Sequence, residues 1–144
     1  MSIKQISVFM ENKPGTLKAM TDTLAASGID MRALSLAETK DFGIARIIVD
    51  NVYHATTALK DAGFIHNLTP VLGVAIPDEP GGLARVLEVL SEAQVNVEYM
   101  YAFLGSKAAD QAYMIFRVQD DAAAASALKA KGIRLVEQDE MAHL

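Results

Sequence analysis

Cysteine is absent from this chain of 144 residues, which excludes disulfides, thiolate metal sites and a cysteine nucleophile. Basic charge is also scarce, since 13 Lys and Arg against 18 Asp and Glu leave a net charge of −5. A nucleic-acid-binding protein needs a basic surface that neutralises phosphates. The composition therefore argues against nucleic acid as a partner. A reducing cytoplasm fits a chain without cysteine, and we expect a cytoplasmic protein.

Long apolar runs are missing too. No run approaches the roughly 20 residues that a membrane-spanning helix needs. The opening stretch, MSIKQISVFMENKPG, places Lys4, Gln5, Glu11 and Asn12 where a signal peptide would be apolar. No low-complexity linker or charged tail is present. These absences predict a soluble protein without a membrane partner.

Recognisable catalytic and metal-binding patterns are absent as well. There is no Ser–His–acid order, no HExxH pattern and no carboxylate pair at an identifiable cleft. The three histidines, His54, His66 and His143, have no acidic or histidine neighbour at ligand spacing. No phosphate-binding loop of the P-loop or dinucleotide type is found. We expect no catalysis, no metal and no cofactor.

The sequence does contain an internal repeat. A shift of 66 residues places Pro14–Leu17 (PGTL) on Pro80–Leu83 (PGGL), together with the apolar positions on either side. After residue 40 the shift becomes 69, because LGSKAAD lengthens a hairpin loop in the second copy. Since the register holds in every expected element, the chain is interpreted as two copies of one module, 1–69 and 70–144.

Each copy shows the same order of secondary structure. Ile6, Val8 and Met10 alternate as in a half-buried strand, and Leu17, Met20 and Leu24 follow at helical spacing. The predicted order is βαββαβ in each copy. Helices on one face of a mainly antiparallel sheet give a ferredoxin-like α+β fold. In the first copy, the expected strands are 4–10, IDMRALSLAE, FGIARIIVD and a fourth that begins at residue 64, and the expected second helix is 53–62. In the second copy, they are 72–76, VNVEYMYAFL, QAYMIFRVQ and a fourth that begins at residue 133, and the expected second helix is 122–131.

The Pro-Gly corner between the first strand and the first helix is the first candidate for a site. Proline at the first helical position would be favourable, and Gly15 and Gly81 would let a ligand approach the backbone closely. Free N–H groups of the first turn, with the helix dipole behind them, suit an anion such as a carboxylate. The alternative interpretation is turn and capping chemistry alone.

Polar residues at the entry to the second strand form the other half of the candidate site. Asp30 and Asn96 occupy equivalent positions there, and each would lie near a corner, either its own or that of a neighbouring module. An amino acid needs donors for its carboxylate and an acceptor for its ammonium group. Backbone N–H groups would supply the donors, and Asp30, Asn96, Asn12 or Asp78 the acceptor. The alternative interpretation is that Asp30 and Asn96 are polar only because turns that lead into a strand favour such residues.

The stretches NKPGTL…SGIDM and DEPGGL…AQVNV resemble the ACT domain, a small regulatory module that commonly binds amino acids. The whole chain resembles a tandem pair of such domains. The family's corner typically reads Asp-x-Pro-Gly-x-Leu, and an Asn opens its second strand. The second copy matches both features, through Asp78, Pro80, Gly81, Leu83 and Asn96. The first copy departs from both, because Asn12 replaces the Asp and Asp30 the Asn.

The resemblance implies a ligand-binding site between neighbouring modules, formed by the corner of one and the second strand of another. It also implies association of modules, which the open edges of the sheets would favour, so we expect a homodimer. The positions that the resemblance assigns to ligand binding are Asn12, Pro14, Gly15, Thr16, Asp30, Met31, Asp78, Pro80, Gly81, Gly82, Asn96 and Val97.

Two classes of function remain open from the sequence. The first is a regulatory protein that senses a free amino acid and signals to a partner, such as a regulated enzyme or another regulator. The second is a small ferredoxin-like enzyme that holds a carboxylate substrate at the corner. A purely structural association module is a third interpretation.

Overall fold

The computed structural model of the chain describes residues 2–105 and 110–144. It divides into two compact units: the first unit is Lys4–Thr69, and the second unit is Pro70–Leu144 together with Ser2 and Ile3. None of the helices in the described residues is long and apolar enough to cross a membrane. The elements in chain order are β1 (Ile3–Glu11), α1 (Thr16–Ala26), β2 (Met31–Glu38), β3 (Phe42–Val49), α2 (Val52–Asp61), β4 (Ile65–Pro77), α3 (Gly82–Glu92), β5 (Val97–Ala102), β6 (Gln111–Val118), α4 (Asp121–Ala130), β7 (Arg134–Val136) and the 3-10 helix η1 (Gln138–His143).

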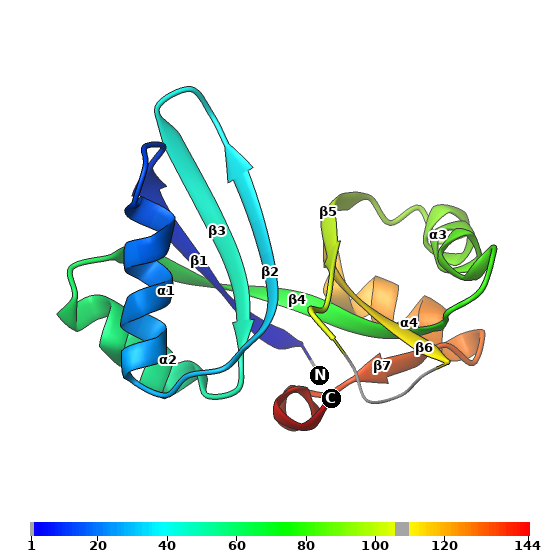
Figure 1. The fold of residues 1–144 in the computed structure, drawn as a ribbon. Coiled ribbons are helices and arrows are strands. Elements are labelled where there is room, and N and C mark those ends of the chain that lie inside the picture. Colours follow the sequence, from blue (N-terminus) through cyan, green and yellow to red (C-terminus); the bar gives the residue numbers. More distant parts are fainter. Residues whose placement is uncertain (1, 106–109) are drawn as a thin grey trace. The chain divides into compact units, whose positions relative to one another are not determined.

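In the first unit, the strands lie in the order β2-β3-β1-β4, and both helices cover one face of the sheet (Figure 1). β3 pairs antiparallel with β1 on one side and with β2 on the other. The register places Ile6 opposite Ile47 and Glu11 opposite Phe42. This order, with βαββαβ connectivity, is that of a ferredoxin-like sheet.

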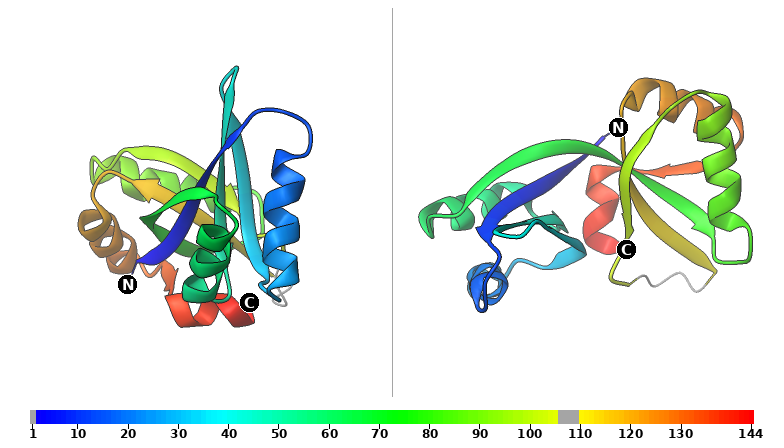
Figure 2. Two further views of the ribbon diagram at one scale, coloured as in Figure 1. Left: turned by 90° about the vertical axis from the view of Figure 1, so that its left-hand side faces the viewer. Right: turned by 90° about the horizontal axis from the view of Figure 1, so that it is seen from above.

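The second unit repeats the arrangement with the order β5-β6-β4-β7, and α3 and α4 again share one face of its sheet (Figure 2). β4 pairs antiparallel with both β6 and β7. Here Leu72 is opposite Phe116 and Pro77 opposite Gln111. These pairs are the first unit's pairs shifted by 66 and 69 residues, so the repeat read from the sequence is also a repeat of strand register. The ferredoxin-like α+β fold is confirmed.

Each unit has its own hydrophobic core between the sheet and the helices. The alternation along each first strand turns every second side chain toward the helices, and the helices contribute apolar residues at i, i+4 spacing. The first core contains Ile6, Val8, Met20, Leu24, Ile47 and Leu59, and the second contains Leu72, Val74, Val86, Leu90, Phe116 and Leu128, all at most 2% exposed.

The expected break between two strands near Pro70 is wrong. The sequence predicts two strands separated near Pro70, whereas β4 is one continuous strand of 13 residues. Proline lacks an N–H but tolerates extended backbone, so a position that does not need to donate accommodates it. The fourth strand of the second unit, β7, is short, with three residues. Part of the expected long hairpin loop, residues 106–109, lies outside the described residues.

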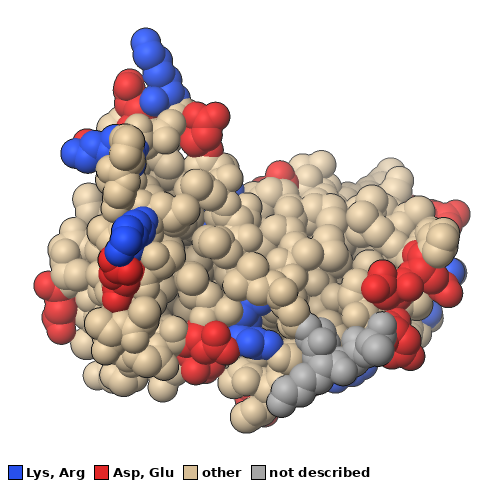
Figure 3. All heavy atoms as spheres, viewed as in Figure 1, with Lys and Arg blue, Asp and Glu red and all other residues tan. Residues whose placement is uncertain are grey.

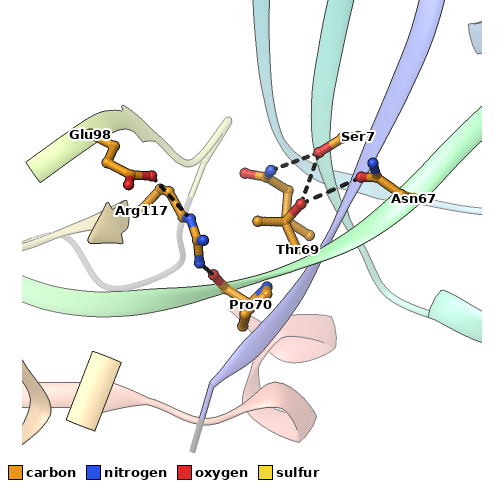
Figure 4. Close-up of polar contacts among 7 residues, drawn as sticks. Ser7, Asn67, Thr69, Pro70, Glu98 and Arg117 are labelled. Atoms are coloured by element: carbon orange, nitrogen blue, oxygen red, sulfur yellow. Dashed lines mark hydrogen bonds and ion pairs between the residues drawn. The ribbon is translucent and has the colours of Figure 1, made fainter. Parts of the chain in front are cut away.

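Side-chain contacts hold β4 within each unit (Figure 4). In the first unit, the hydroxyl groups of Thr69 and Ser7 lie 3.3 Å apart. In the second unit, Arg117 donates from Nη1 to the carbonyl oxygen of Pro70 at 2.9 Å, and its Nε lies 3.3 Å from a carboxylate oxygen of Glu98. The carbonyl of Pro70 is therefore satisfied by a cation that a carboxylate of β5 also holds.

The first helix of each unit is followed by a residue in the left-handed conformation. This residue is Gly28 in the first unit, with φ 69°, and Gln94 at the equivalent position of the second, with φ 57°. Their N–H groups donate to the carbonyls of Ala25 and Ser91 at 3.0 Å in both cases. Among the described residues, Gln94 is the only non-glycine residue with positive φ. The backbone ends both helices in the same way, although only one copy has the residue that suits this end.

Replacing Gln94 by glycine should therefore stabilise the protein. Left-handed backbone costs a residue with a β-carbon roughly 1–2 kcal/mol, and the larger entropy of glycine in the unfolded chain offsets part of this gain. We expect Gln94→Gly to raise the free energy of unfolding in urea by about 0.5–1 kcal/mol. The reciprocal change, Gly28→Gln, should lower it by about 1 kcal/mol. A destabilised Gln94→Gly variant would contradict this account.

The start of α4 contains a carboxylate in an unfavourable environment. Asp120 caps the helix by accepting a hydrogen bond from the N–H of Ala123 at 3.0 Å. The next residue, Asp121, has a buried carboxylate oxygen without a hydrogen-bond partner. Burial raises the pKa of Asp121 above its ordinary value of 3.8, the charge of Arg117 lowers it, and Asp120 and Glu98 raise it further. The net effect is a raised pKa, so protonation of Asp121 is more favourable in the folded protein than in the unfolded chain.

This balance predicts a pH dependence of stability. Because the folded pKa of Asp121 lies above the unfolded value, the folded protein binds more protons, and stability falls as pH rises through this window. Asp121→Asn removes the titration. The stability of the variant relative to wild type should therefore increase from pH 3.8 toward pH 7, as measured by urea denaturation across this range. A difference that does not vary with pH, or that decreases, would contradict the assignment.

Candidate functional site

The corner between the first strand and the first helix is a β-turn of type II in the first unit. The N–H of Thr16 donates to the carbonyl of Lys13 at 3.4 Å, and Gly15 has φ 90° and ψ −13°. These angles are those of the third residue of a type II turn, and Pro14 occupies the second position, where proline is favoured. Positive φ at this position requires glycine or a residue that tolerates strain.

The second unit forms the same turn. The N–H of Gly82 donates to the carbonyl of Glu79 at 3.1 Å, and Gly81 has φ 86° and ψ −4°. The expectation that proline is the first helical residue is therefore wrong. Pro14 and Pro80 precede the glycine N-caps, and the helices begin at Thr16 and Gly82. A left-handed residue directly after the proline prevents the helix from starting there.

The first turn of each helix has uncapped N–H groups. Neither glycine N-cap has a side chain to accept a hydrogen bond, and neither helix has an acidic residue in its first turn. In the described part of the chain, the N–H groups of Leu17 and Lys18 have no acceptor, and the same holds for Leu83 and Ala84. Such donors, at the positive end of the helix dipole, suit a carboxylate.

Polar side chains beside the two corners differ in what they bind. Asn12 donates from Nδ2 to the carbonyl oxygen of Thr39 at 3.1 Å and lies 3.4 Å from a carboxylate oxygen of Glu38. It therefore ties the corner to the hairpin between β2 and β3. The equivalent Asp78 is exposed and has no such contact among the described residues. Since a carboxylate cannot donate, Asp78 could not replace Asn12 in this role.

Thr16 and Gly82 occupy equivalent positions, and the space around each explains why one is a threonine and the other a glycine. The hydroxyl of Thr16 donates to the carbonyl of Glu11 at 2.8 Å, with the carbonyl of Lys13 at 3.0 Å. A β-carbon on Gly82 would lie 2.3 Å from the carbonyl oxygen of Pro77, the equivalent of Glu11. The helix thus starts closer to the preceding strand in the second unit, and its corner admits no side chain there.

The polar residues at the entry to the second strands are exposed. Asp30 Oδ2 lies 3.0 Å from Nη1 of Arg32, and its carbonyl and N–H exchange hydrogen bonds with Asp50 at 3.1 Å. The carbonyl of Asn96 accepts a hydrogen bond from the N–H of Gln119 at 3.2 Å, and its side chain makes no hydrogen bond with the described residues. Asn96 is therefore the freer of the two to meet a ligand.

A β-bulge follows each of these residues. The register of β2 shifts between Met31 and Ala33, and that of β5 between Val97 and Tyr99. The expected ligand-binding residues Met31 and Val97 thus begin equivalent irregularities in equivalent strands. Bulges re-aim side chains, and their presence in both copies indicates that the backbone of this strand entry was retained after duplication.

Within one unit, the corner and the strand entry lie far apart. They are at opposite ends of α1, whose 11 residues span roughly 16 Å at 1.5 Å per residue. The expectation that Asp30 could lie near its own corner is therefore wrong. The chain folds this way because β2 runs parallel to β1 after a full helix has returned across the sheet. A site that combines a corner with a strand entry needs a second module.

A pocket that the sequence reasoning missed lies beside the first corner. Its volume is about 480 Å³, and its lining comprises Phe9, Met10, Glu11, Lys13, Thr16, Ala19, Phe42, Gly63, Phe64 and Ile65. The second unit has a pocket of about 290 Å³ whose lining includes the equivalent residues Ala75, Ile76, Pro77, Gly82, Arg85, Gln111, Gly132, Ile133 and Arg134. The signal in the sequence was the mismatch of the two copies at these positions, for example Phe42 against Gln111.

The charged and metal-ligating residues form no single cluster in the described part of the chain. On the face shown in Figure 3, Lys and Arg are scattered, many of them beside acidic residues, and form no continuous basic field. No group of three His, Cys, Asp or Glu that could hold a metal occurs among residues 2–105 and 110–144. The arrangement offers donors for an anion beside apolar surface, which is suited to recognition of a small carboxylate.

Comparison with known proteins agrees with this fold. A family model described as an ACT domain pair matches residues 1–144. The crystal structure of protein BT0572 from Bacteroides thetaiotaomicron is 40% identical, with a TM-score of 0.93, over 100% of this chain and 98% of that chain. No curated protein matches the chain.

More distant similarity extends to regulatory subunits. The ligand-free regulatory subunit of aspartate kinase from Thermus thermophilus is 19% identical, with a TM-score of 0.68, over 90% of both chains. That of Thermus flavus is 17% identical, with a TM-score of 0.58, over 88% of this chain and 90% of that chain. At these identities the similarity concerns the fold. The match of the family model to every residue shows that the chain belongs to the ACT domain family and consists of an ACT domain pair.

Proposed function

We propose that this protein is a cytoplasmic regulatory protein that binds a free amino acid and transmits its occupancy to a partner protein, without catalysis. Membership of a family of regulatory domains supports the regulatory role. The names of the two Thermus proteins, regulatory subunits of aspartate kinase, support a partner that is an enzyme or another regulator.

The observation that carries the proposal is the pair of uncapped corners. Each corner presents two first-turn N–H groups without an acceptor, on Leu17 and Lys18 and on Leu83 and Ala84. A hydrogen bond to a charged group contributes about 1.5–3 kcal/mol, so a carboxylate that accepts from these donors would be held firmly. A β-carbon added to Gly15 or Gly81 would meet nothing within 4 Å, so space for a ligand is open beside both.

The residues at the strand entries would complete the site. We propose that Asn96 and Asp78 supply polar contacts for the ammonium group, since both are exposed and neither side chain makes a hydrogen bond within the described chain. Asn12 and Asp30, which are engaged with Thr39 and Arg32, would contribute less. The remaining proposed ligand-binding positions are Pro14, Gly15, Thr16, Met31, Pro80, Gly81, Gly82 and Val97.

A homodimer would bring further modules together, and we propose this state. β2 and β5 are edge strands of their units, and an edge with unpaired backbone groups favours pairing with another chain. Since a corner and a strand entry of one unit lie at opposite ends of α1, association of modules would be the way to place them around one ligand. Occupancy would then stabilise one arrangement of modules over another, which is the basis of regulation.

The experiment is a thermal-denaturation screen of the protein against the common amino acids, combined with a variant that fills both corners. In Lys18→Glu/Ala84→Glu, each new carboxylate stands at the third helical position, where its negative charge lies beside the uncapped N–H groups and repels the carboxylate of the ligand. We expect wild type to gain about 2.7 kcal/mol at a ligand concentration 100 times Kd. The variant should gain nothing and remain folded.

The matched control is Lys18→Gln/Ala84→Gln, which changes the same exposed positions without adding negative charge. It should retain most of the ligand-induced stabilisation. If no amino acid stabilises wild type at millimolar concentration, the proposed function is refuted. If the charged variant responds as wild type does, binding occurs away from the corners.

A further inference from the structure

The pocket beside the first corner lies entirely within the first unit. It is bordered by the end of β1, the start of α1, the start of β3 and the turn that leads from α2 into β4. Its volume of about 480 Å³ falls within the range of small-molecule sites. The first helical turn, through Thr16 and Ala19, forms one wall.

Large apolar side chains are exposed at this pocket. Phe42 is 63% exposed, Ile65 73% and Phe9 38%, and all three line the pocket. Burying such a side chain yields about 1.5–3 kcal/mol, so leaving three of them in contact with water at one place forgoes considerable stabilisation. Clustered exposed apolar residues mark binding sites more often than folding requirements.

The second unit shows that the fold does not require them. Phe9, Phe42 and Ile65 correspond to Ala75, Gln111 and Arg134, and the strand registers make the first two equivalences exact, since Glu11 is opposite Phe42 and Pro77 opposite Gln111. The same backbone therefore folds with small, polar or basic residues at these positions. The apolar character belongs to the first unit alone.

Charged residues of opposite sign stand at the rim of the first pocket. Lys13 Nζ lies 3.0 Å from Glu11 Oε2, with both side chains more than half exposed. An exposed ion pair contributes at most about 1 kcal/mol, so both groups can rearrange toward a ligand at little cost. A cation and an anion side by side complement the carboxylate and ammonium groups of an amino acid. The second unit has Glu79 and Pro77 instead.

We propose that the pocket of the first unit binds a free amino acid with a large apolar side chain. Lys13 holds its carboxylate, Glu11 holds its ammonium group, and the side chain lies among Phe9, Phe42 and Ile65. This inference rests on the proposed function and names its ligand class. The equivalent pocket of the second unit, with Arg85, Lys131 and Arg134 in its lining, lacks these apolar side chains, so this large apolar ligand binds in the first unit only.

The test is isothermal titration calorimetry of the full chain with phenylalanine, leucine and methionine, and with serine and aspartate for comparison. We expect binding of one or more of the first three, at one molecule per chain, and none of the last two. In Phe42→Gln/Ile65→Arg, the first pocket receives the residues that the second unit carries. Loss of these apolar contacts should weaken binding at least about tenfold, while the melting temperature without ligand changes little, because both positions are exposed.

The matched control is Gln111→Phe, which adds an aromatic residue to the equivalent position of the second unit and should leave affinity unchanged. If apolar amino acids bind the double variant as tightly as wild type, or if only polar amino acids bind wild type, the inference is wrong while the proposed function stands. If no amino acid binds wild type, both fail. If the double variant instead changes the sedimentation mass without affecting affinity, the apolar side chains form a contact between chains, and the inference is also overturned.

Discussion

Both units depend on a residue with positive φ between the first strand and the first helix. Gly15 and Gly81 supply it, and the type II turn that they close reverses the chain so that the helix returns across the sheet. Met20 and Leu24 then reach the core formed by β1 and β3. No neighbouring atom would obstruct a β-carbon at either glycine. The requirement is therefore purely conformational, which leaves the surface beside each glycine open to other molecules.

The duplicated backbone carries two different surfaces. Turns, bulges, helix ends and strand registers coincide at shifts of 66 and 69, down to the hydrogen bonds of Gly28 and Gln94. Side chains diverge where the backbone does not need them, as at Thr16 and Gly82 or at Asn12 and Asp78. Features that both copies share are those that the fold requires. The apolar lining of the pocket beside the first corner occurs in one copy only, so the fold does not require it.

The sequence predicted the order and type of the helices and strands, because alternating and helical apolar periodicities are strong and occur twice. It also located the corners through Pro-Gly. It did not distinguish proline within a turn from proline at the first helical position, since both give the same pattern before a helix. The separation of Asp30 from its own corner follows from the length of α1. The pocket escaped because Phe9, Phe42 and Ile65 are distant in sequence and meet only through the β1–β3 register and the turn before β4.

The continuity of β4 affects how such a chain can evolve. Domains joined by exposed linkers can be exchanged by recombination within the linker, where few contacts are disturbed. Here the last strand of one unit and the first strand of the next are a single strand of 13 residues, and no loop lies between them. A crossover that separates the units must divide a strand whose two halves complete different sheets. Transfer of one unit to another protein by such a crossover is thereby disfavoured.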